Sequence, residues 1–395
     1  MEVIMKNTIL SHHPRAYGTV IVLLLVTLNA HFAFAKNAPR YKSAILVDVE
    51  TGQVLFEENA DKQVIPASVV KMMVLLLAME RIEAGEVSLS DTVTISAWAS
   101  KIGGHQVYLA EGEQFRFEEI LKAIAISSAN DAATAAAEFL AGDADAFVEQ
   151  MNARAQELGM EHTTFANEHG LPPDKGQEEN HTTARDIALL GRELLKHPQL
   201  LAWASTQEDT FRNGTFILTN TNRQLLRKYQ GADGLKTGFH SRGAGFNVCA
   251  TAKRDNRRLI AVVMGASQKS DRYNAVVKLF NKGFNQYKRV VVLQKGFTVG
   301  DPLLVNRGKE RTTMLVASDN AVVLVPKGKE LEITQDVRIP VDAIIAPVDQ
   351  GMRFGEAVIL VGDQEVARVD LVTGDRVEKG NLLELLKWWI VNKIS

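Results

Sequence analysis

The sequence predicts an α/β chain of the α+β kind, in which helices cover an antiparallel sheet and are followed by a small all-β domain and a C-terminal amphipathic helix. Two observations lead to this fold class. Between residues 41 and 287 the apolar pattern changes from strands to helices and back to strands. From residue 290 onward, short β-like runs alternate with turns that contain glycine, and the last residues return to a helical pattern.

The order of the predicted elements brings the two ends of the first region together. Strands are expected at Tyr41–Val49 and Gln53–Glu57. Helical stretches follow at Pro66–Met79, Phe117–Ile126, Asp131–Leu140, Ala146–Leu158 and Thr183–Lys196. Strand patterns resume at Thr215–Thr219, Gly234–Phe239, Gly245–Ala252 and Arg258–Met264, before a closing helix at Arg272–Tyr287. Because helices separate the early strands from the late ones, we expect one sheet to pair both sets.

The N-terminal residues 1–35 have the pattern of a secretory signal peptide. Lys6 and Arg15 precede the apolar run Val20–Val26, and Ala33-Phe34-Ala35 offers small residues for cleavage after Ala35. An uncleaved anchor is the alternative, although the run is short for a membrane span. We therefore expect an exported protein that works at the periplasmic face of the cytoplasmic membrane.

The remaining chain divides by pattern into a main domain at residues 36–289, an all-β domain at residues 290–376 and a terminal helix at residues 377–395. Nearly the whole circumference of the run from Asn381 to Ile394 is apolar, and the run includes Trp388 and Trp389. With its flanking lysines it is typical of a helix that lies in a membrane surface without spanning it. A helix that docks on its own domain is the alternative.

Composition excludes several classes of protein. With 46% hydrophobic and 23% charged residues the chain is globular, and its net charge of −2 does not favour nucleic-acid binding. The single cysteine, Cys249, excludes an intrachain disulfide and is interpreted as a core residue. The nine histidines show no His-Glu-x-x-His spacing, which argues against a metallopeptidase, and we expect no cofactor.

Three short motifs carry the chemistry: Ser68-Val69-Val70-Lys71, Ser128-Ala129-Asn130 and Lys236-Thr237-Gly238. Each is weak by itself, but the ordered set indicates a serine acyltransferase that acts on peptides ending in a free carboxylate. The literal string Ser318-Asp319-Asn320 also occurs, but it follows the lysine motif and is interpreted as a turn.

The side chains of the first two motifs have functional groups suited to proton transfer. A spacing of three puts Ser68 and Lys71 on one face of a helix, where an uncharged lysine in apolar surroundings can take the serine proton. Ser128 can relay a proton to the leaving amine, and Asn130 can hold Lys71 and the substrate amide. Without the other motifs, an N-terminal capping role for the serines would be the simpler interpretation.

The third motif contains groups that can bind a terminal carboxylate. Lys236 and Thr237 present an ammonium and a hydroxyl on a strand edge, after the strand-like Gly234-Leu235. Gly238 lets substrate approach the backbone. The N–H of Phe239, with that of Ser68, is a candidate oxyanion hole.

These motifs, together with Ala166–Leu171, Asp233–Gly238 and Gly245-Phe246-Asn247, resemble those of low-molecular-mass penicillin-binding proteins, the serine-type D-Ala-D-Ala carboxypeptidases of the DacA type. The resemblance covers nearly the whole chain after the signal peptide. It implies a β-lactamase-like transpeptidase domain, no metal, and removal of the last D-alanine from peptidoglycan stem peptides, with β-lactam antibiotics as covalent inhibitors.

By this resemblance Ser68 forms the acyl-enzyme, Lys71 is the base, Ser128 and Asn130 complete the cleft, and Lys236 with Thr237 holds the carboxylate. Arg272 is similar to the arginine that assists there in the family. The chain departs from the family pattern at Ala129, at Ala166 and in the loop Phe239–Gly243, which is one residue longer. The longer loop leaves the second oxyanion donor open.

Two alternatives share the motifs or the fold. A β-lactamase would need a device that activates water, for which Glu168 is the candidate. A catalytically silent wall-binding protein would keep the fold without the reaction, but the intact motif residues argue against it.

Overall fold

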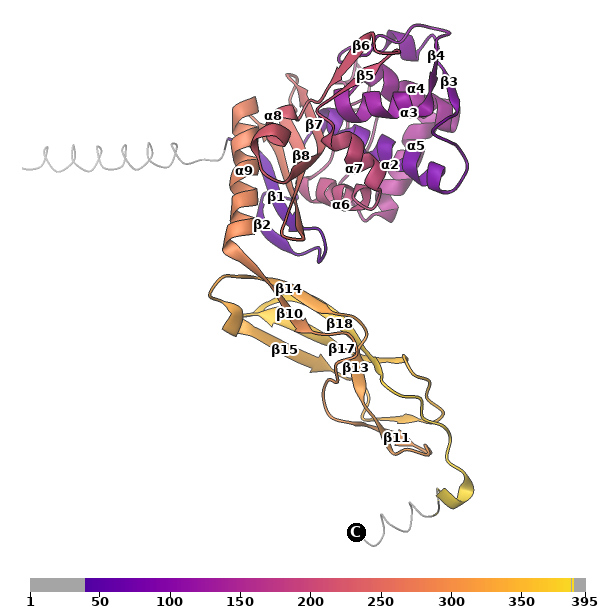
Figure 1. Ribbon diagram of the computed structural model, residues 1–395, viewed down its shortest axis with the longest axis vertical. Helices are drawn as coiled ribbons and strands as arrows, with labels where there is room; N and C mark the ends of the chain where they lie inside the picture. The colour runs from indigo at the N-terminus through magenta and orange to yellow at the C-terminus, as the bar shows by residue number, and fades with distance from the viewer. Residues whose placement is uncertain (1–39, 385, 387–395) are drawn as a thin grey trace, which may run out of the picture. The chain divides into compact units, whose positions relative to one another are not determined.

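The computed structural model describes residues 40–384 and residue 386 (Figure 1). The predicted signal peptide at residues 1–35 lies outside the described residues, as does most of the predicted terminal helix. At the end of the described chain Leu382, Leu383 and Glu384 are helical.

The centre of the main domain is a five-stranded antiparallel sheet in the order β2-β1-β9-β8-β7. Its strands are β1 (Ser43–Asp48), β2 (Val54–Glu58), β7 (Ala232–His240), β8 (Gly245–Arg254) and β9 (Arg257–Ala266). The pairing of β1 with β9 joins residues more than two hundred positions apart, as in Ile45 opposite Val262. The predicted union of the two ends of this region is therefore confirmed.

Both faces of this sheet are buried, because successive side chains of a strand point to opposite faces. On β9, Ile260 and Val262 belong to the core on one face, and Leu259 and Ala261 belong to the core on the other. The second face is covered by α9 (Lys269–Gln286), which contacts β8 and β9 and lies along the sheet in Figure 1.

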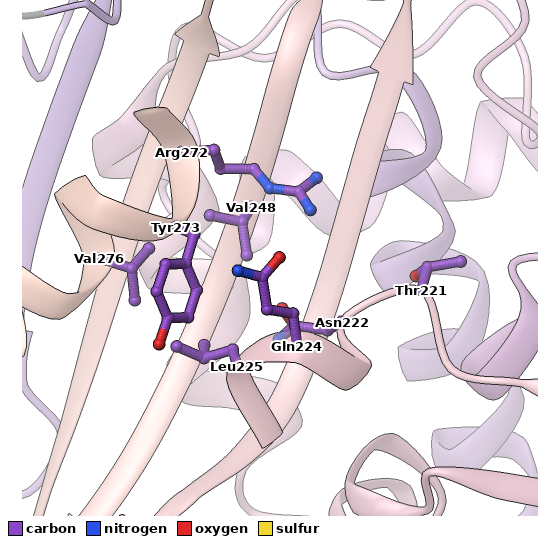
Figure 2. Close-up of a pocket in the computed structure, with 8 residues that line it drawn as sticks. All are labelled: Thr221, Asn222, Gln224, Leu225, Val248, Arg272, Tyr273 and Val276. Carbon is purple, nitrogen blue, oxygen red and sulfur yellow. The ribbon is translucent and has the colours of Figure 1, made fainter. Parts of the chain in front are cut away.

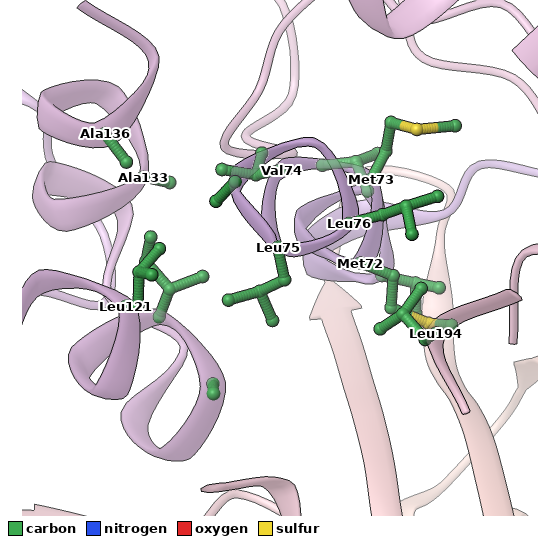
Figure 3. Packing of buried hydrophobic residues seen from close by; sticks show 14 of the residues in the cluster. Met72, Met73, Val74, Leu75, Leu76, Leu121, Ala133, Ala136 and Leu194 are labelled. Atoms are coloured by element: carbon green, nitrogen blue, oxygen red, sulfur yellow. The ribbon is translucent and has the colours of Figure 1, made fainter. Parts of the chain in front are cut away.

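Helices pack against the first face. The helices α6 (Ala184–Leu194) and α7 (Pro198–Ser205) contact its strands, and α2 (Lys71–Glu83) packs between α6 and a further group formed by α3 (Phe117–Lys122), α4 (Asn130–Ala141) and α5 (Ala144–Glu157). The helix α2 is buried on all sides from Lys71 to Met79, as its uniformly apolar sequence predicts. Figure 3 shows Met72, Met73 and Leu75 of α2 extending toward different neighbours. The catalytic candidate Lys71 thus begins a helix that has no solvent-exposed first turn.

Several local elements differ from the sequence prediction. The helix expected from Pro66 begins as a 3₁₀ turn at Ala67–Val70, and α2 itself starts at Lys71. The helix expected through Ile126 ends in a wider π turn at Ala123–Ser127. Periodicity does not distinguish these turns from α-helix because the residues involved are equally apolar. The helices α7 and α8 (Arg223–Lys228) were not predicted, since each is shorter than the span over which helical periodicity can be recognised.

Two small antiparallel hairpins complete the main domain. One pairs β3 (Thr92–Thr94) with β4 (Gln114–Arg116), and the other pairs β5 (Glu208–Phe211) with β6 (Phe216–Thr219). Only the β6 strand was predicted from the sequence.

The last domain is all-β, as predicted. Its sheets have the orders β10-β14, β12-β11-β16 and β13-β18-β17-β15, and they enclose one apolar core. The strands are β10 (Tyr287–Leu293), β11 (Leu303–Asn306), β12 (Thr312–Thr313), β13 (Leu315–Ala317), β14 (Ala321–Pro326), β15 (Ile333–Arg338), β16 (Ala343–Ile345), β17 (Arg353–Val361) and β18 (Gln364–Thr373). In the part of the chain that the structure describes, no helix is both long and apolar enough to cross a membrane.

Candidate active site

The structure brings the three sequence motifs together from different elements. Ser68 lies in the 3₁₀ turn before α2, and Lys71 is the first residue of α2. Ser128 and Asn130 come from the junction between the π turn and α4. Lys236 lies in the middle of β7, the edge strand of the sheet, and not at the end of a strand as its sequence context suggested.

The amine of Lys71 is held by three oxygen atoms. Nζ lies 3.1 Å from Ser68 Oγ and donates to Asn130 Oδ1 at 2.6 Å, and it also donates to the backbone carbonyl of His169. A neutral amine has two N–H groups and one lone pair. With both N–H groups directed at the carbonyl oxygens of Asn130 and His169, the lone pair is left to face the hydroxyl of Ser68.

The surroundings of Lys71 favour this neutral form. Lys71 has no solvent exposure, and burial lowers its pKa to about 7, although Glu168 and Asp131 act in the opposite direction. Burial and the charge of Lys71 also lower the pKa of His169 to about 3, so this imidazole is neutral in the folded protein. The lowered pKa of Lys71 and its contact with Ser68 would allow the amine to accept the proton of the serine hydroxyl.

Asn130 is oriented by a second hydrogen bond. Its Nδ2 donates to the carbonyl of Gly103 at 2.8 Å, which leaves Oδ1 directed at Lys71. The next residue, Asp131, accepts from the N–H groups of Val107 and Leu109 and so fixes the loop that carries Gly103. The contacts with Gly103 and with Lys71 thus fix the orientation of the Asn130 side-chain amide.

Ser128 and Lys236 form a second pair. Lys236 Nζ donates to Ser128 Oγ at 2.6 Å and to the carbonyl of Thr237 at 3.2 Å. Ser128 adopts the left-handed conformation, with φ 66° and ψ 31°, which ends the π turn and turns the chain into α4. Because its oxygen accepts from Lys236, the proton of Ser128 remains available to another acceptor.

Lys236 and Arg272 are two buried cationic side chains that have no carboxylate partner among the described residues. Among the described residues, neither Lys236 nor Arg272 takes part in an ion pair, and both side chains are nearly inaccessible. Burial, followed by the charges of Lys71 and Arg272, lowers the pKa of Lys236, and burial lowers that of Arg272 to about 10. Arg272 Nη1 donates to the carbonyl of Asn247 at 3.2 Å. A bound anion would relieve the mutual repulsion of these cations.

Thr237 continues the polar edge of β7. Its Oγ1 donates to Thr221 Oγ1 at 2.7 Å, and Thr221 lines a small pocket together with Arg272 (Figure 2). In Figure 2 the guanidinium of Arg272 extends from α9 across the sheet toward the side on which Thr221 lies. Thr237 and Arg272 therefore border one pocket through Thr221, whereas Lys236, the neighbouring residue on β7, reaches Ser128.

Two glycines allow the close packing around Ser68. A Cβ on Gly238 would lie 2.5 Å from the carbonyl oxygen of Pro66 and 3.1 Å from the nitrogen of Ser68. Gly170 has φ +77°, and a Cβ there would lie 2.3 Å from the carbonyl oxygen of Ala67. The serine turn is thus pressed between the segment after His169 and the edge strand β7, and only residues without a side chain fit on either side.

The remaining sequence candidates lie elsewhere or have other partners. Ser318-Asp319-Asn320 forms a bend between β13 and β14, where Asn320 Oδ1 accepts from the N–H of Lys295, so it is a turn as predicted. Glu168 is buried, accepts from the hydroxyl of Thr134, and has its pKa raised by burial. Within residues 40–384 and 386, no three His, Cys, Asp or Glu side chains gather in a way that would hold a metal ion.

Sequence reasoning assigned no role to two groups that shape the site. Thr221, the partner of Thr237, lies in the polar triplet Asn220-Thr221-Asn222 before α8, and that triplet was the available signal. Asn247 donates to the carbonyls of Ile65 and Pro66 and accepts from the N–H of Gly265, which ties the turn before Ser68 to the sheet.

Comparison with known proteins identifies the family. Residues 31–268 match the D-alanyl-D-alanine carboxypeptidase family, and residues 287–379 match the C-terminal domain of penicillin-binding protein 5. The chain therefore belongs to the D-alanyl-D-alanine carboxypeptidase family, which confirms the resemblance found in its motifs.

Relatives and solved structures agree with this assignment. The chain is 34% identical to D-alanyl-D-alanine carboxypeptidase DacF of Bacillus subtilis, over 94% of this chain and 97% of the relative. It is 32% identical to DacC of Escherichia coli over 85% and 84% of the two chains. Penicillin-binding protein 5 from Haemophilus influenzae superimposes with a TM-score of 0.77 at 28% identity, over 87% of this chain and 98% of that one. Penicillin-binding protein D2 from Listeria monocytogenes in its ampicillin-bound form gives 0.57 at 31% identity, over 63% and 98%.

The environment of Lys71 predicts how acylation depends on pH. Because burial lowers its pKa to about 7, the amine is mostly protonated below this pH and mostly neutral above it. A base must be neutral, so the rate at which a fluorescent penicillin acylates the protein should rise with pH through about 7 and then level off. Stopped-flow fluorescence measures this rate. Asn130→Asp would place a carboxylate against the amine and should move the midpoint to higher pH. A wild-type rate that does not change with pH would contradict the role of Lys71.

Proposed function

We propose that the protein is a serine-type D-Ala-D-Ala carboxypeptidase that removes the terminal D-alanine of peptidoglycan pentapeptides through an acyl-enzyme on Ser68. One observation carries the proposal: a serine hydroxyl 3.1 Å from a buried amine lies beside buried cations that have no carboxylate partner among the described residues. The first feature supports nucleophilic attack, and the second supports recognition of a peptide that ends in a free carboxylate.

The proposed acylation uses the geometry of the first pair. Ser68 Oγ attacks the carbonyl carbon of the penultimate D-alanine while Lys71 Nζ accepts the hydroxyl proton. The amide C–N bond then breaks, an ester to Ser68 forms, and D-alanine leaves after its amine receives a proton through Ser128. Lys236 supports this relay because it holds the oxygen of Ser128 at 2.6 Å.

Deacylation consumes water and restores the enzyme. Water adds to the ester carbonyl, the shortened peptide leaves with a new carboxylate, and the proton returns to Ser68. In both steps negative charge develops on the carbonyl oxygen. The backbone N–H groups of Ser68 and Phe239 are the proposed donors to it, supported by the close approach of Gly238 to the nitrogen of Ser68.

The terminal carboxylate is proposed to bind Lys236, Thr237 and Arg272. A carboxylate placed there would compensate the buried charges of the lysine and the arginine. β-Lactam antibiotics also carry a carboxylate next to a reactive carbonyl, so the same groups support covalent inhibition by penicillins.

The structure gives no support to the β-lactamase alternative. That activity needs a group that activates water, and Glu168 was the candidate in the sequence. Glu168 is only 3% exposed, and its carboxylate is occupied by a hydrogen bond from the Thr134 hydroxyl. The contact between Lys71 and Ser68 likewise argues against a catalytically silent protein.

The nucleophile can be tested directly. Ser68→Ala should abolish both penicillin labelling and release of D-alanine from a D-Ala-D-Ala peptide, because the ester can no longer form. Peptide mass spectrometry of the wild-type penicillin adduct should place the label on Ser68. Circular dichroism and thermal unfolding of the variant serve as the folding control. A label on Ser128 or Ser318 would show that the assignment is wrong.

The carboxylate site can be tested by comparing two substrates. Lys236→Ala should lower kcat/KM for a free-acid D-Ala-D-Ala peptide by about 10- to 100-fold, since a hydrogen bond to a charged group is worth about 1.5–3 kcal/mol. The loss should be much smaller for the same peptide amidated at its C-terminus. Lys236→Ala also removes the hydrogen bond to Ser128. This loss should affect both peptides equally, so the amidated peptide serves as its control. Equal losses on the two peptides would contradict carboxylate binding.

We also propose that the C-terminal residues hold the exported enzyme at the periplasmic face of the cytoplasmic membrane. Leu382, Leu383 and Leu386 are 85%, 71% and 54% exposed, as expected of apolar side chains that contact lipid instead of protein. Lys379 is bridged to Gly308 of the small domain, and the N–H of Gly380 donates to the carbonyl of Arg307. A truncation that preserves the small domain should therefore begin at Asn381.

Deletion of residues 381–395 should release the protein from liposomes that contain anionic lipid, without changing its activity on small peptides. The expectation rests on the apolar run and its flanking lysines, and added salt should weaken binding of the untruncated protein. The double variant Trp388→Glu/Trp389→Glu should behave like the deletion. Sedimentation with liposomes measures binding. If all three proteins sediment equally, or none does, the membrane proposal fails.

A further inference from the structure

A groove of about 740 Å³ lies next to the candidate carboxylate site. It runs along α8 and reaches the first turn of α9. Its lining is polar and basic, formed by His105, Thr219, Asn220, Thr221, Arg223, Gln224, Arg227, Lys228 and Lys269. None of the three sequence motifs lines this groove, so the proposed reaction leaves its chemistry unexplained.

The charge of the groove is concentrated and largely uncompensated. Arg223 is paired with Glu208 at 3.0 Å. Among the residues that the structure describes, Arg227, Lys228 and Lys269 take part in no ion pair, and all three are exposed. The chain as a whole has a net charge of −2, so this cluster does not reflect a generally basic surface. Such a groove attracts an anionic ligand.

The groove is continuous with the proposed carboxylate site. Thr221 and Gln224 line both the groove and the small pocket that contains Arg272 (Figure 2). Thr221 accepts the hydrogen bond from Thr237, and Lys269 precedes Arg272 by three residues on α9, which puts the two cations on one side of that helix. A ligand in the groove would therefore reach the groups that bind the terminal carboxylate.

The direction of the substrate decides which part of it reaches the groove. Along β7, Gly238 packs against Ser68, and Thr237 contacts the groove through Thr221. The carboxylate that Thr237 and Arg272 are proposed to bind belongs to the residue after the cleaved bond. The groove thus lies on the side of the leaving group, and a single D-alanine is much smaller than the space available there.

We infer that this groove is a leaving-group subsite for an amino acid that carries a second carboxylate beyond the α-carboxylate that is proposed to bind Lys236 and Arg272. The inference rests on the proposed function and adds a substrate class to it. Cleavage of such a substrate forms the same ester on Ser68 and breaks the same type of amide bond. The leaving amine takes the proton as D-alanine would, and water completes the hydrolysis. The enzyme would accordingly release an acidic D-amino acid from the position after the penultimate D-alanine, as well as releasing a terminal D-alanine.

The test uses acyl-D-alanyl peptides that differ only in the last residue: D-Glu, D-Gln or D-Ala. D-Glu and D-Gln have nearly the same size, so their ratio of kcat/KM reports the second carboxylate alone. The purified full chain should prefer D-Glu to D-Gln by roughly 3- to 10-fold at low salt, and high salt should reduce this preference because the cations are exposed.

The variant Arg227→Gln/Lys228→Gln should bring the ratio of D-Glu to D-Gln close to one while hydrolysis of the D-Ala peptide is retained. Lys62→Gln/Lys278→Gln is the matched control, because it removes two exposed positive charges that do not line the groove. It should keep the wild-type ratio. No preference in the wild type, or a preference that survives in the groove variant, would overturn the inference while leaving the carboxypeptidase proposal intact. Failure of the wild type to hydrolyse the D-Ala peptide would contradict both.

Discussion

The burial of the Lys71 amine is the constraint on which the rest of the site depends. An ammonium ion that is removed from water loses its hydration, and an apolar helix layer offers little in return. Lys71 begins α2, whose next eight residues are all buried. Its partners are the neutral oxygen atoms of Ser68, Asn130 and the His169 backbone. The hydrophobic core around α2 therefore lowers the pKa of the amine toward neutrality, which the proposed role of Lys71 as a base requires.

The same fold also holds cations that it does not compensate. Lys236 lies on the edge strand β7 and Arg272 at the start of α9, on the two elements that flank the cleft. Burial disfavours the charged form of each side chain when the site is empty. Both side chains are buried in the fold and are nearly inaccessible to solvent. The carboxylate of the proposed substrate would compensate both charges. In the proposed function, recognition would thus draw on an electrostatic imbalance that is present in the folded chain before substrate arrives.

The surroundings of the site come from other elements than its motifs. The motif residues carry the proposed reaction, whereas α8 and the beginning of α9 form the groove beside the proposed carboxylate site. In this chain those elements place Arg227, Lys228 and Lys269 around an open groove. Their side chains take no part in the hydrophobic core, so they can determine leaving-group preference without changing the packing that keeps Lys71 neutral.

The sequence by itself determined the fold class, the family and the identity of the candidate residues, because strand and helix periods, motif order and residue chemistry are local properties. It did not determine that Ser68 lies in a 3₁₀ turn or that Ser128 ends a π turn in a left-handed conformation, since apolar periodicity is the same in these turns as in α-helix. Nor did it predict α8, Thr221 as the partner of Thr237, or the groove beside them. The helix α8 is too short to show a helical period, and the contacts where β7, α8 and α9 meet leave no periodic signal in the sequence. Only the tertiary structure decided these features. It also decided the contacts of the site itself, because it brings Lys71 within reach of Asn130 and Lys236 within reach of Ser128.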